Sequence, residues 1–314
     1  MSDESSSQLE INDISMATPE RAQEKEENVF DILRSEDDEK IQDGFKKKIL
    51  NLLKKYKTLE KYEVVIIYDE KNEIDKYHSN TIYESIQYLG GEKDILLILC
   101  SLGGKIEPAY FISKVCKRVK NEKFVIAVPR AAKSAATLIC LGADEIHMGL
   151  LSELGPIDPQ INGFPALGLV NALEKIAYLA DKFPKSSELF SKYLTTNLSI
   201  SHLGYFERIN ESASQYAQRL LDGKDFPHPY TAEKLAHHFT NHYKDHSFVI
   251  DSDEAKQLLG DQIVQVDTEE YRFADELYQF FDLCSLILKI VYGKQLKYVG
   301  KIGARPGISE NKED

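Results

Sequence analysis

The sequence predicts an α/β fold in which parallel strands alternate with helices in a right-handed spiral. Short runs of continuous apolar and β-branched residues at 63–68, 95–100 and 124–128 carry this prediction. Apolar runs without alternation are typical of strands that are covered on both faces, as in parallel βαβ units. Helical patterns such as 109–119 separate the runs, and crossovers of this kind are nearly always right-handed. We therefore expect one parallel sheet with helices on both faces.

Composition sets the class of protein. The chain has 314 residues, of which 42% are hydrophobic, enough for a sizeable core. Its 51 acidic and 39 basic residues give a formal net charge of −12, which disfavours binding to nucleic-acid phosphates. The four cysteines have neither zinc-site spacing nor the density of a disulfide scaffold. We expect a cytoplasmic protein with no nucleic-acid partner.

The chain divides into three parts. Residues 1–40 are rich in Ser, Glu, Asp and Gln and have a single aromatic residue, Phe30, so we expect a flexible acidic tail. Residues 41–292 form the predicted domain, which contains a largely helical segment at about 165–246. Residues 293–314 are expected to be a C-terminal tail. The start of the chain lacks the pattern of a signal peptide, and no stretch approaches the roughly 18 apolar residues of a membrane span.

The remaining elements follow from periodicity. An amphipathic helix is predicted at 45–56. The predicted strands after the third are short, at 145–148, 248–250 and 262–266. The later predicted helices begin with one at 135–140 and continue at 166–181, 205–221, 231–246, 255–258 and 268–292.

A pair of glycines, Gly103 and Gly104, follows the second predicted strand. Glycines let backbone N–H groups face a cavity, and the next helix adds the positive end of its dipole. Such a loop can stabilise a developing oxyanion. An ordinary βα turn would also use glycine, so the pair alone is a weak signal.

Ser134 follows the third strand and opens a helix, which makes it the candidate nucleophile. Its position resembles a nucleophile elbow, in which the hydroxyl is exposed and the next N–H, that of Ala135, joins Gly103 as a second oxyanion donor. The alternative is a helix-capping serine, whose hydroxyl accepts hydrogen bonds from first-turn amides. The glycine loop and the serine together favour the catalytic interpretation.

These motifs resemble a known family. The order strand, Ser101-Leu102-Gly103-Gly104, helix, strand, Ala132-Lys133-Ser134-Ala135-Ala136-Thr137, helix, strand, then Leu154-Gly155-Pro156-Ile157-Asp158-Pro159-Gln160 is similar to the ClpP/crotonase superfamily. Within it, residues of about 60–270 are most similar to the serine dehydrogenase proteinases, relatives of signal-peptide peptidases. The resemblance implies a ClpP/crotonase-like spiral, a peptide or protein substrate, a homo-oligomer, and catalytic roles for Ser134, Gly103 and Ala135.

One departure concerns the general base. Where Clp-type peptidases have a catalytic histidine, this chain reads Pro156-Ile157-Asp158-Pro159-Gln160. Signal-peptide peptidases suggest a Ser-Lys dyad instead, in which burial lowers the pKa of the lysine. The candidates are Lys175 first, then Lys182 and Lys185, with a smaller share for Lys133.

Histidines supply the other possible base. His238, His242 and His246 share one face of the helix predicted at 231–246, where His237 also lies. One of them can fold back on Ser134, oriented by Asp245 or Asp251. Zinc and nucleotide motifs are missing, so we expect neither a metal nor another cofactor.

The sequence thus predicts a serine peptidase of Ser-Lys type, and two alternatives remain. A crotonase-type enzyme would use the same oxyanion donors on an acyl-CoA thioester, would need an acidic base and would tolerate Ser134→Ala. A noncatalytic ClpP-like scaffold would lack the base altogether.

Overall fold

A twisted central sheet organises the body of the protein, for which the computed structural model describes residues 28–35, 37–161, 164–197 and 200–311. Residues 1–27 of the tail predicted at 1–40 lie outside the described residues. The strands are β1 (Tyr62–Asp69), β2 (Asp94–Ser101), β3 (Phe124–Val128), β4 (Ala131–Ala132), β5 (Glu145–Met148), β6 (Glu153–Leu154), β7 (Gln160–Ile161), β8 (Phe164–Pro165), β9 (Val264–Val266), β10 (Lys294–Lys301) and β11 (Gly307–Glu310).

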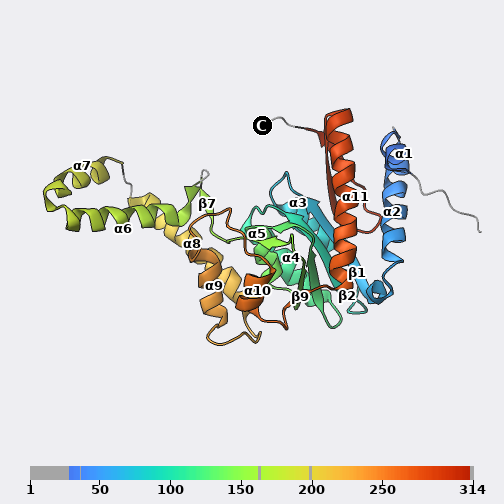
Figure 1. Ribbon diagram of the computed structural model, residues 1–314, viewed down its shortest axis with the longest axis horizontal. Helices are drawn as coiled ribbons and strands as arrows, with labels where there is room; N and C mark the ends of the chain where they lie inside the picture. The colour runs from blue at the N-terminus through green and yellow to red at the C-terminus, as the bar shows by residue number, and fades with distance from the viewer. Residues whose placement is uncertain (1–27, 36, 162–163, 198–199, 312–314) are drawn as a thin grey trace, which may run out of the picture.

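The helices cover both faces of the sheet and extend beyond it (Figure 1). The α-helices are α1 (Val29–Leu33), α2 (Asp38–Leu53), α3 (Lys76–Ile86), α4 (Ile106–Val119), α5 (Ala135–Leu141), α6 (Ala166–Lys182), α7 (Ser187–Asn197), α8 (Ile200–Leu221), α9 (Ala232–Asn241), α10 (Ser252–Leu259) and α11 (Glu269–Tyr292). Short 3-10 helices are η1 (Lys57–Lys61) and η2 (Pro184–Ser186).

The core of the sheet is parallel, as the sequence predicted. Strands run in the order β11-β10-β1-β2-β3-β5-β9, and the five from β1 to β9 pair in parallel. Crossover helices join them, as parallel pairing requires. The predicted α/β fold with strands at 63–68, 95–100, 124–128 and 145–148 is therefore confirmed.

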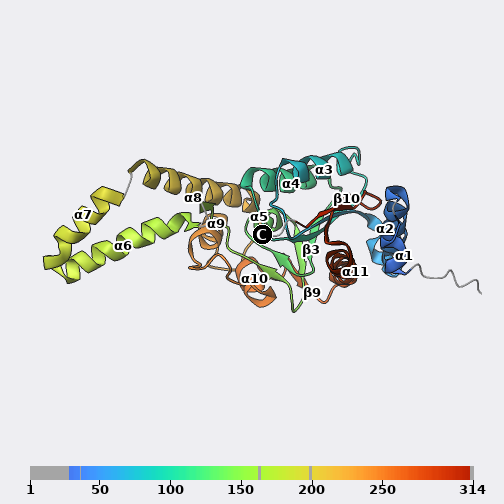
Figure 2. The same ribbon diagram turned by 90° about the horizontal axis from the view of Figure 1, so that it is seen from above.

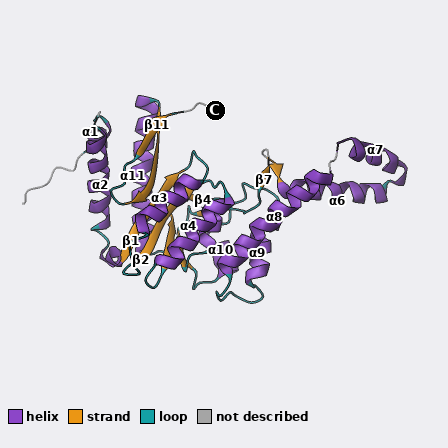
Figure 3. Ribbon diagram, turned by 180° about the vertical axis from the view of Figure 1, so that it is seen from behind, coloured by secondary structure: helices purple, strands orange, loops and turns teal. Residues whose placement is uncertain are grey.

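Two apolar layers sandwich the sheet. Alternate residues of β1 point to opposite faces, so Val65 and Ile67 pack with α3, α4 and α5, while Val64 and Ile66 pack with α2 and α11. Figure 3 shows the first set of helices across one face of the strands. Because both faces are covered, the strands need apolar residues at every position, which is why they read as continuous runs.

A helical arm projects from the body on the side away from α2 and α11 (Figures 1 and 2). It consists of α6, α7 and the first part of α8, and α8 continues back to the body. The helical segment predicted after the core strands is therefore present. Apolar side chains on the arm are exposed, among them Tyr178, Phe183 and Leu189.

Four expectations differ from the structure. The predicted tail at 293–314 contains β10, which pairs antiparallel with β1 and buries Tyr298 against Phe281. Helical structure begins at Val29, within the predicted flexible tail, because Ile32 and Leu33 pack with the α2 and α11 layer.

The helix predicted at 231–246 ends at Asn241, so His246 does not continue its face. The chain leaves the helix there because Ile250 returns to form a bridge with Leu154. The predicted strand at 248–250 is reduced to this bridge.

Within the described residues, every helix is too short or too polar to span a lipid bilayer.

Candidate functional site

The glycine loop lies against Ser134 at the carboxyl end of β2. Gly103 has φ 111° and Gly104 has φ 145°, values that L side chains rarely adopt. A Cβ on Gly103 would lie 2.7 Å from Cβ of Ser134. Glycine is therefore required here for the two segments to approach each other, and the sequence prediction that they meet agrees with this geometry.

Ser134 has a strained backbone. Its φ is 51° and its ψ −118°. Among the described residues, Ser134 and Asp267 are the two non-glycine residues with a positive φ. Such strain is found at functional sites and is a feature of the nucleophile elbow. The Ser134 hydroxyl makes no cap hydrogen bond to the first turn of α5. The geometry is thus not that of a helix-capping serine.

The amides around Ser134 differ in availability. The Gly103 N–H donates to Oγ of Ser101 at 3.3 Å, so this predicted donor already has a partner. The Gly104 N–H makes no hydrogen bond to the described part of the chain. Ala135 is the first residue of α5, where an N–H has no acceptor within the helix. Within the described residues the amides of Ala135 and Gly104 are therefore the unpaired ones, whereas the sequence analysis, which included Gly104 in the loop, singled out Gly103 and Ala135 as donors.

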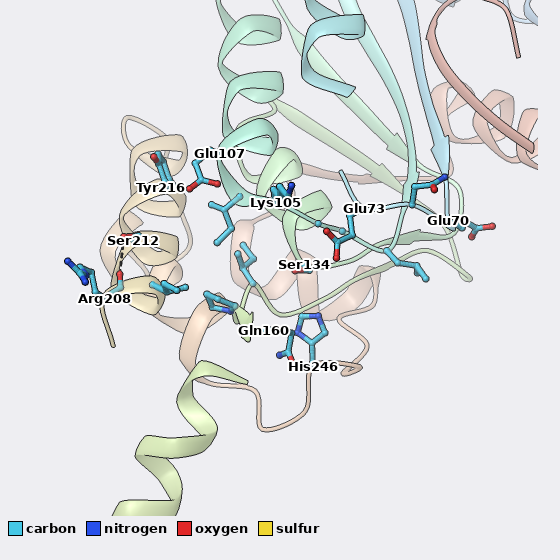
Figure 4. A pocket seen from close by; sticks show the side chains of 18 of the residues that line it. Glu70, Glu73, Lys105, Glu107, Ser134, Gln160, Arg208, Ser212, Tyr216 and His246 are labelled. Carbon is cyan, nitrogen blue, oxygen red and sulfur yellow. Dashed lines mark hydrogen bonds between the residues drawn. The ribbon is translucent and has the colours of Figure 1, made fainter. Parts of the chain in front are cut away.

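A cavity of about 760 Å³ opens in front of Ser134 (Figure 4). Its walls come from the glycine loop, the loop after β1, the start of α4, the Ile157–Gln160 segment and the inner face of α8. The ring of Tyr216 on α8 packs against that of Tyr110 on α4, with the ring centroids 4.7 Å apart, which holds α8 in place as a wall. The charged residues lining it are Glu70, Lys71, Glu73, Lys105, Glu107 and Arg208.

His246 lines the same cavity as Ser134 (Figure 4). Its Nδ1 lies 2.6 Å from Oδ1 of Asp158, a buried carboxylate whose other oxygen accepts from Nε2 of Gln160 at 2.8 Å. The side chain of His246 is one-third exposed. When Nδ1–H donates to the aspartate, Nε2 is left as a proton acceptor.

The sequence analysis proposed His246 among its histidines but with the wrong partner. Asp245 instead accepts hydrogen bonds from Ser247, and Asp251 caps α10. Asp158 lies in the segment where Clp-type peptidases have a histidine. The presence of an aspartate in this segment was the one feature of the sequence that could have pointed to Asp158. His238 and His242 stack on each other on α9 and do not line the cavity.

The structure does not bring the predicted lysines to Ser134. Lys175 is exposed on α6, with its Nζ 5.1 Å from the ring centre of Tyr178, and it does not line the cavity. Lys182 and Lys185 also lie on the arm. The periodicity of the sequence predicts that these lysines lie on or near a helix. How far that helix lies from Ser134 depends on how it packs against the rest of the protein.

Lys133, which the sequence analysis ranked below the other lysines as a base, is bonded to groups other than Ser134. Its Nζ lies 3.0 Å from Oε2 of Glu153 and donates to the carbonyl oxygen of Phe248 at 3.1 Å. It therefore ties the strand before Ser134 to the loop that carries His246.

Other reactive groups are buried or scattered. Burial raises the pKa of the Cys100 and Cys140 thiols, which keeps them in the unreactive neutral form. Among the described residues, no group of His, Cys, Asp and Glu side chains is arranged to hold a metal ion.

Comparison with known proteins identifies a related family. Residues 39–183 match the model of the family described as ClpP-like SDH-type serine proteinase. The resemblance to serine dehydrogenase proteinases, identified from the motifs around Gly103 and Ser134, is confirmed, and with it a ClpP-like serine-protease fold.

Two relatives come from Methanocaldococcus jannaschii. Uncharacterized protein MJ0137 is 32% identical over 201 residues, which cover 64% of this chain and 64% of that protein. Uncharacterized protein MJ1495 is 29% identical over 166 residues, 50% of this chain and 54% of that protein. The ClpP-like chain thus spans less than two thirds of the length of these relatives.

Two similar solved structures are of the 1510-N membrane-bound stomatin-specific protease. One is a serine-to-alanine mutant, with a TM-score of 0.42 and 17% identity, covering 70% of this chain and 83% of that chain. The other is a lysine-to-alanine mutant in complex with a substrate peptide, with a TM-score of 0.42 and 16% identity, covering 80% and 87%.

Proposed function

We propose that this protein is a serine peptidase that hydrolyses peptide or protein substrates with Ser134 as nucleophile. The observation that carries the proposal is the backbone of Ser134, which is strained, free of a capping role and open to a cavity. A strained serine at a helix start has a physical reason when its hydroxyl must be presented to a substrate. The serine-proteinase family of residues 39–183 supports this function.

The proposed base is His246, with Asp158 as its orienting group. The Asp158 carboxylate holds Nδ1–H, so Nε2 can take the proton of Ser134 as Oγ attacks the substrate carbonyl carbon. The imidazolium then gives this proton to the leaving amine, the acyl-enzyme forms, and water releases the acid by the same route.

The developing oxyanion needs donors on the other side of Ser134. The proposal assigns this role to the N–H of Ala135 and to the Gly103–Gly104 loop. Its Gly104 amide makes no hydrogen bond to the described residues. Each such donor contributes about 10²–10³ in rate in other serine peptidases.

A lysine base remains the second candidate. Lys175 is the predicted one, and it would have to reach Ser134 by a different placement of α6, since it is exposed on the arm here. Arg208, Lys105 and Lys71 line the cavity, but none of them is buried. Exposed lysines favour their protonated form, so His246, which is oriented by the buried Asp158, is the better base.

The test of the nucleophile is covalent labelling by a fluorophosphonate probe. We expect wild type to be labelled once per chain and Ser134→Ala to lose labelling entirely. Ser212→Ala is the matched control, because Ser212 lines the same cavity from α8, and it should be labelled like wild type. Unlabelled wild type, or a labelled Ser134→Ala variant, would rule out the peptidase.

One observation favours a crotonase-type reaction as an alternative. Glu73 lines the same cavity as Ser134 (Figure 4), which supplies an acidic group of the kind that such an enzyme needs. If Ser134→Ala retained activity on an acyl-CoA thioester while Glu73→Gln lost it, this alternative would replace the peptidase.

The homo-oligomer and the cytoplasmic location remain proposals. The arm supports an oligomer, because exposed apolar side chains such as Tyr178, Phe183 and Leu189 favour a partner surface. Light scattering coupled to gel filtration should give a mass above the 35.7 kDa of one chain. A monomer at micromolar concentration would contradict this expectation.

A further inference from the structure

The loop between β1 and α3 holds the glycine loop in place. The N–H of Ile74 donates to the carbonyl oxygen of Gly103 at 2.7 Å, and the N–H of Lys105 donates to the carbonyl oxygen of Ile74 at 2.8 Å. A Cβ on Gly104 would lie 2.2 Å from the nitrogen of Ile74, so the two backbones are in direct contact. The orientation of the Gly103–Gly104 peptide therefore depends on the position of Ile74.

A buried histidine joins the two ends of that loop. Nε2 of His78 lies 3.3 Å from Oδ2 of Asp69, the last residue of β1. Nδ1 of His78 lies 2.9 Å from Oδ1 of Asp75, the residue that caps α3. His78 is 2% exposed and Asp69 is 1% exposed. An imidazole enclosed in this way fixes the distance between the loop's start and its end.

The two aspartates also order the loop itself. Oδ1 of Asp69 accepts from the backbone N–H of Asn72 at 2.9 Å, and both of its oxygens accept from the Asn72 side chain. Burial alone would raise the pKa of Asp69, but hydrogen bonds from His78 and Asn72 outweigh burial and hold the pKa below its usual value. Asp69 is therefore an ionised acceptor at neutral pH.

We propose that His78 is a positioning residue that orients the oxyanion-binding amides through Ile74. The proposal rests on the proposed function, which gives the Gly103–Gly104 loop its role. The carbonyl of Gly103 and the N–H of Gly104 belong to one trans peptide and point in opposite directions. Holding the carbonyl on Ile74 directs the Gly104 amide away from Ile74 and to the other side of the peptide.

The first experiment measures the loop without using catalysis. Hydrogen exchange followed by mass spectrometry should show faster exchange in peptides that contain Ile74 and Lys105 in His78→Gln than in wild type. The matched control is His147→Gln, since His147 is 3% exposed and bonds Thr268 and Glu145 but makes no contact with the glycine loop. Equal exchange in both variants at these amides would overturn the proposal.

The second experiment measures the consequence for the site. With the fluorophosphonate probe, His78→Gln should lower the maximal labelling rate about tenfold, while the half-saturating probe concentration stays unchanged, because oriented amides act on the transition state. His147→Gln should keep the wild-type rate. A slowed His147→Gln, or an unslowed His78→Gln, would show that His78 has only a structural role.

A milder variant guards against misfolding. Asp75→Asn keeps a side-chain oxygen for the α3 cap, and Asp75 is partly exposed, so the variant should fold. It weakens the hold on His78 and should change exchange and labelling in the same direction by less. If wild type is not labelled at all, the peptidase fails, while the exchange data still decide whether His78 orders the glycine loop.

Discussion

The body and the arm of this protein contrast in how they hold their side chains. In the body, Phe124 of β3 and Ala135 and Leu138 of α5 are fully buried. On the arm, Tyr178 and Leu189 expose more than half of their surface. The arm therefore gains little from packing within one chain, and a site residue on it is held less firmly than one in the body.

This contrast decides how the candidate bases are weighed. His246 is on the body side, bonded to a buried carboxylate, whereas Lys175 is exposed on the arm, with its Nζ over the exposed ring of Tyr178. A base must be held within hydrogen-bond reach of the nucleophile. The predictions below test whether the body alone completes the site.

The largest effect is expected from the base. His246→Gln should lower the labelling rate by about ten-thousandfold or more, since loss of a triad member costs roughly 10⁴–10⁶ in rate. Lys175→Gln should leave the rate within about twofold of wild type, because a side chain outside the cavity does not contribute to the barrier. Stopped-time labelling with the fluorophosphonate probe measures both.

The opposite result would be informative. A large loss of labelling rate in Lys175→Gln, together with nearly wild-type labelling of His246→Gln, would identify Lys175 as the base. It would also show that α6 moves to the cavity in the active protein.

The second contrast is in stability. Phe124→Ala, at the start of β3, should lower the free energy of unfolding by about 3–5 kcal/mol, because it leaves a cavity between the sheet and its helices. Tyr178→Ala on the arm should change it by no more than about 0.5 kcal/mol. Urea unfolding followed by circular dichroism measures both, and comparable losses would mean that the arm is packed in solution.

Lys224, at the junction of arm and body, should make the stability of the folded protein depend on pH. Lys224, just after α8, donates to the carbonyl oxygens of Leu141 and Ala143 at the end of α5. Burial, with a further contribution from Lys117, lowers its pKa to about 7. The unfolded lysine keeps its proton to higher pH, so between pH 7 and pH 9 the unfolded state binds more protons and stability rises, by up to about 2 kcal/mol.

The matching variant is Lys224→Met. It should show a smaller rise in the urea midpoint from pH 7 to pH 9 than wild type does. An equal rise in the two proteins would mean that Lys224 is not the group responsible.

The smallest expected effect is the change in stability on substituting the residue that precedes a helix, at Asp251 and at Ser134. Asp251 caps α10 by accepting from the N–H groups of Asp253 and Glu254, so Asp251→Ala should cost about 1 kcal/mol. Ser134 makes no cap bond, so Ser134→Ala should change stability by less than about 0.5 kcal/mol while abolishing labelling. A large stability loss in Ser134→Ala, measured by thermal unfolding, would point to a structural serine.

Much of the site was predictable because short sequence motifs around Gly103 and Ser134 identify it. Gly103 and Ser134 each follow a buried strand and precede a helix, and parallel strands bring their carboxyl ends to one edge of the sheet. Their meeting therefore follows from the order of elements. Asp158 and His246 lie far apart along the chain, and no spacing rule connects them. They come together because the Leu154–Ile250 bridge pairs their two segments.

The amino-acid sequence by itself determined the parallel sheet, the glycine loop and the serine at the start of α5, since these depend on apolar periodicity and on residues a few positions apart. Only the tertiary structure decided that Lys175 lies on an arm outside the cavity, that His246 meets Asp158, that 294–301 completes the sheet and that His78 braces the glycine loop. Contacts between distant segments are set by how whole elements pack, and packing is a property of the assembled chain rather than of any local pattern.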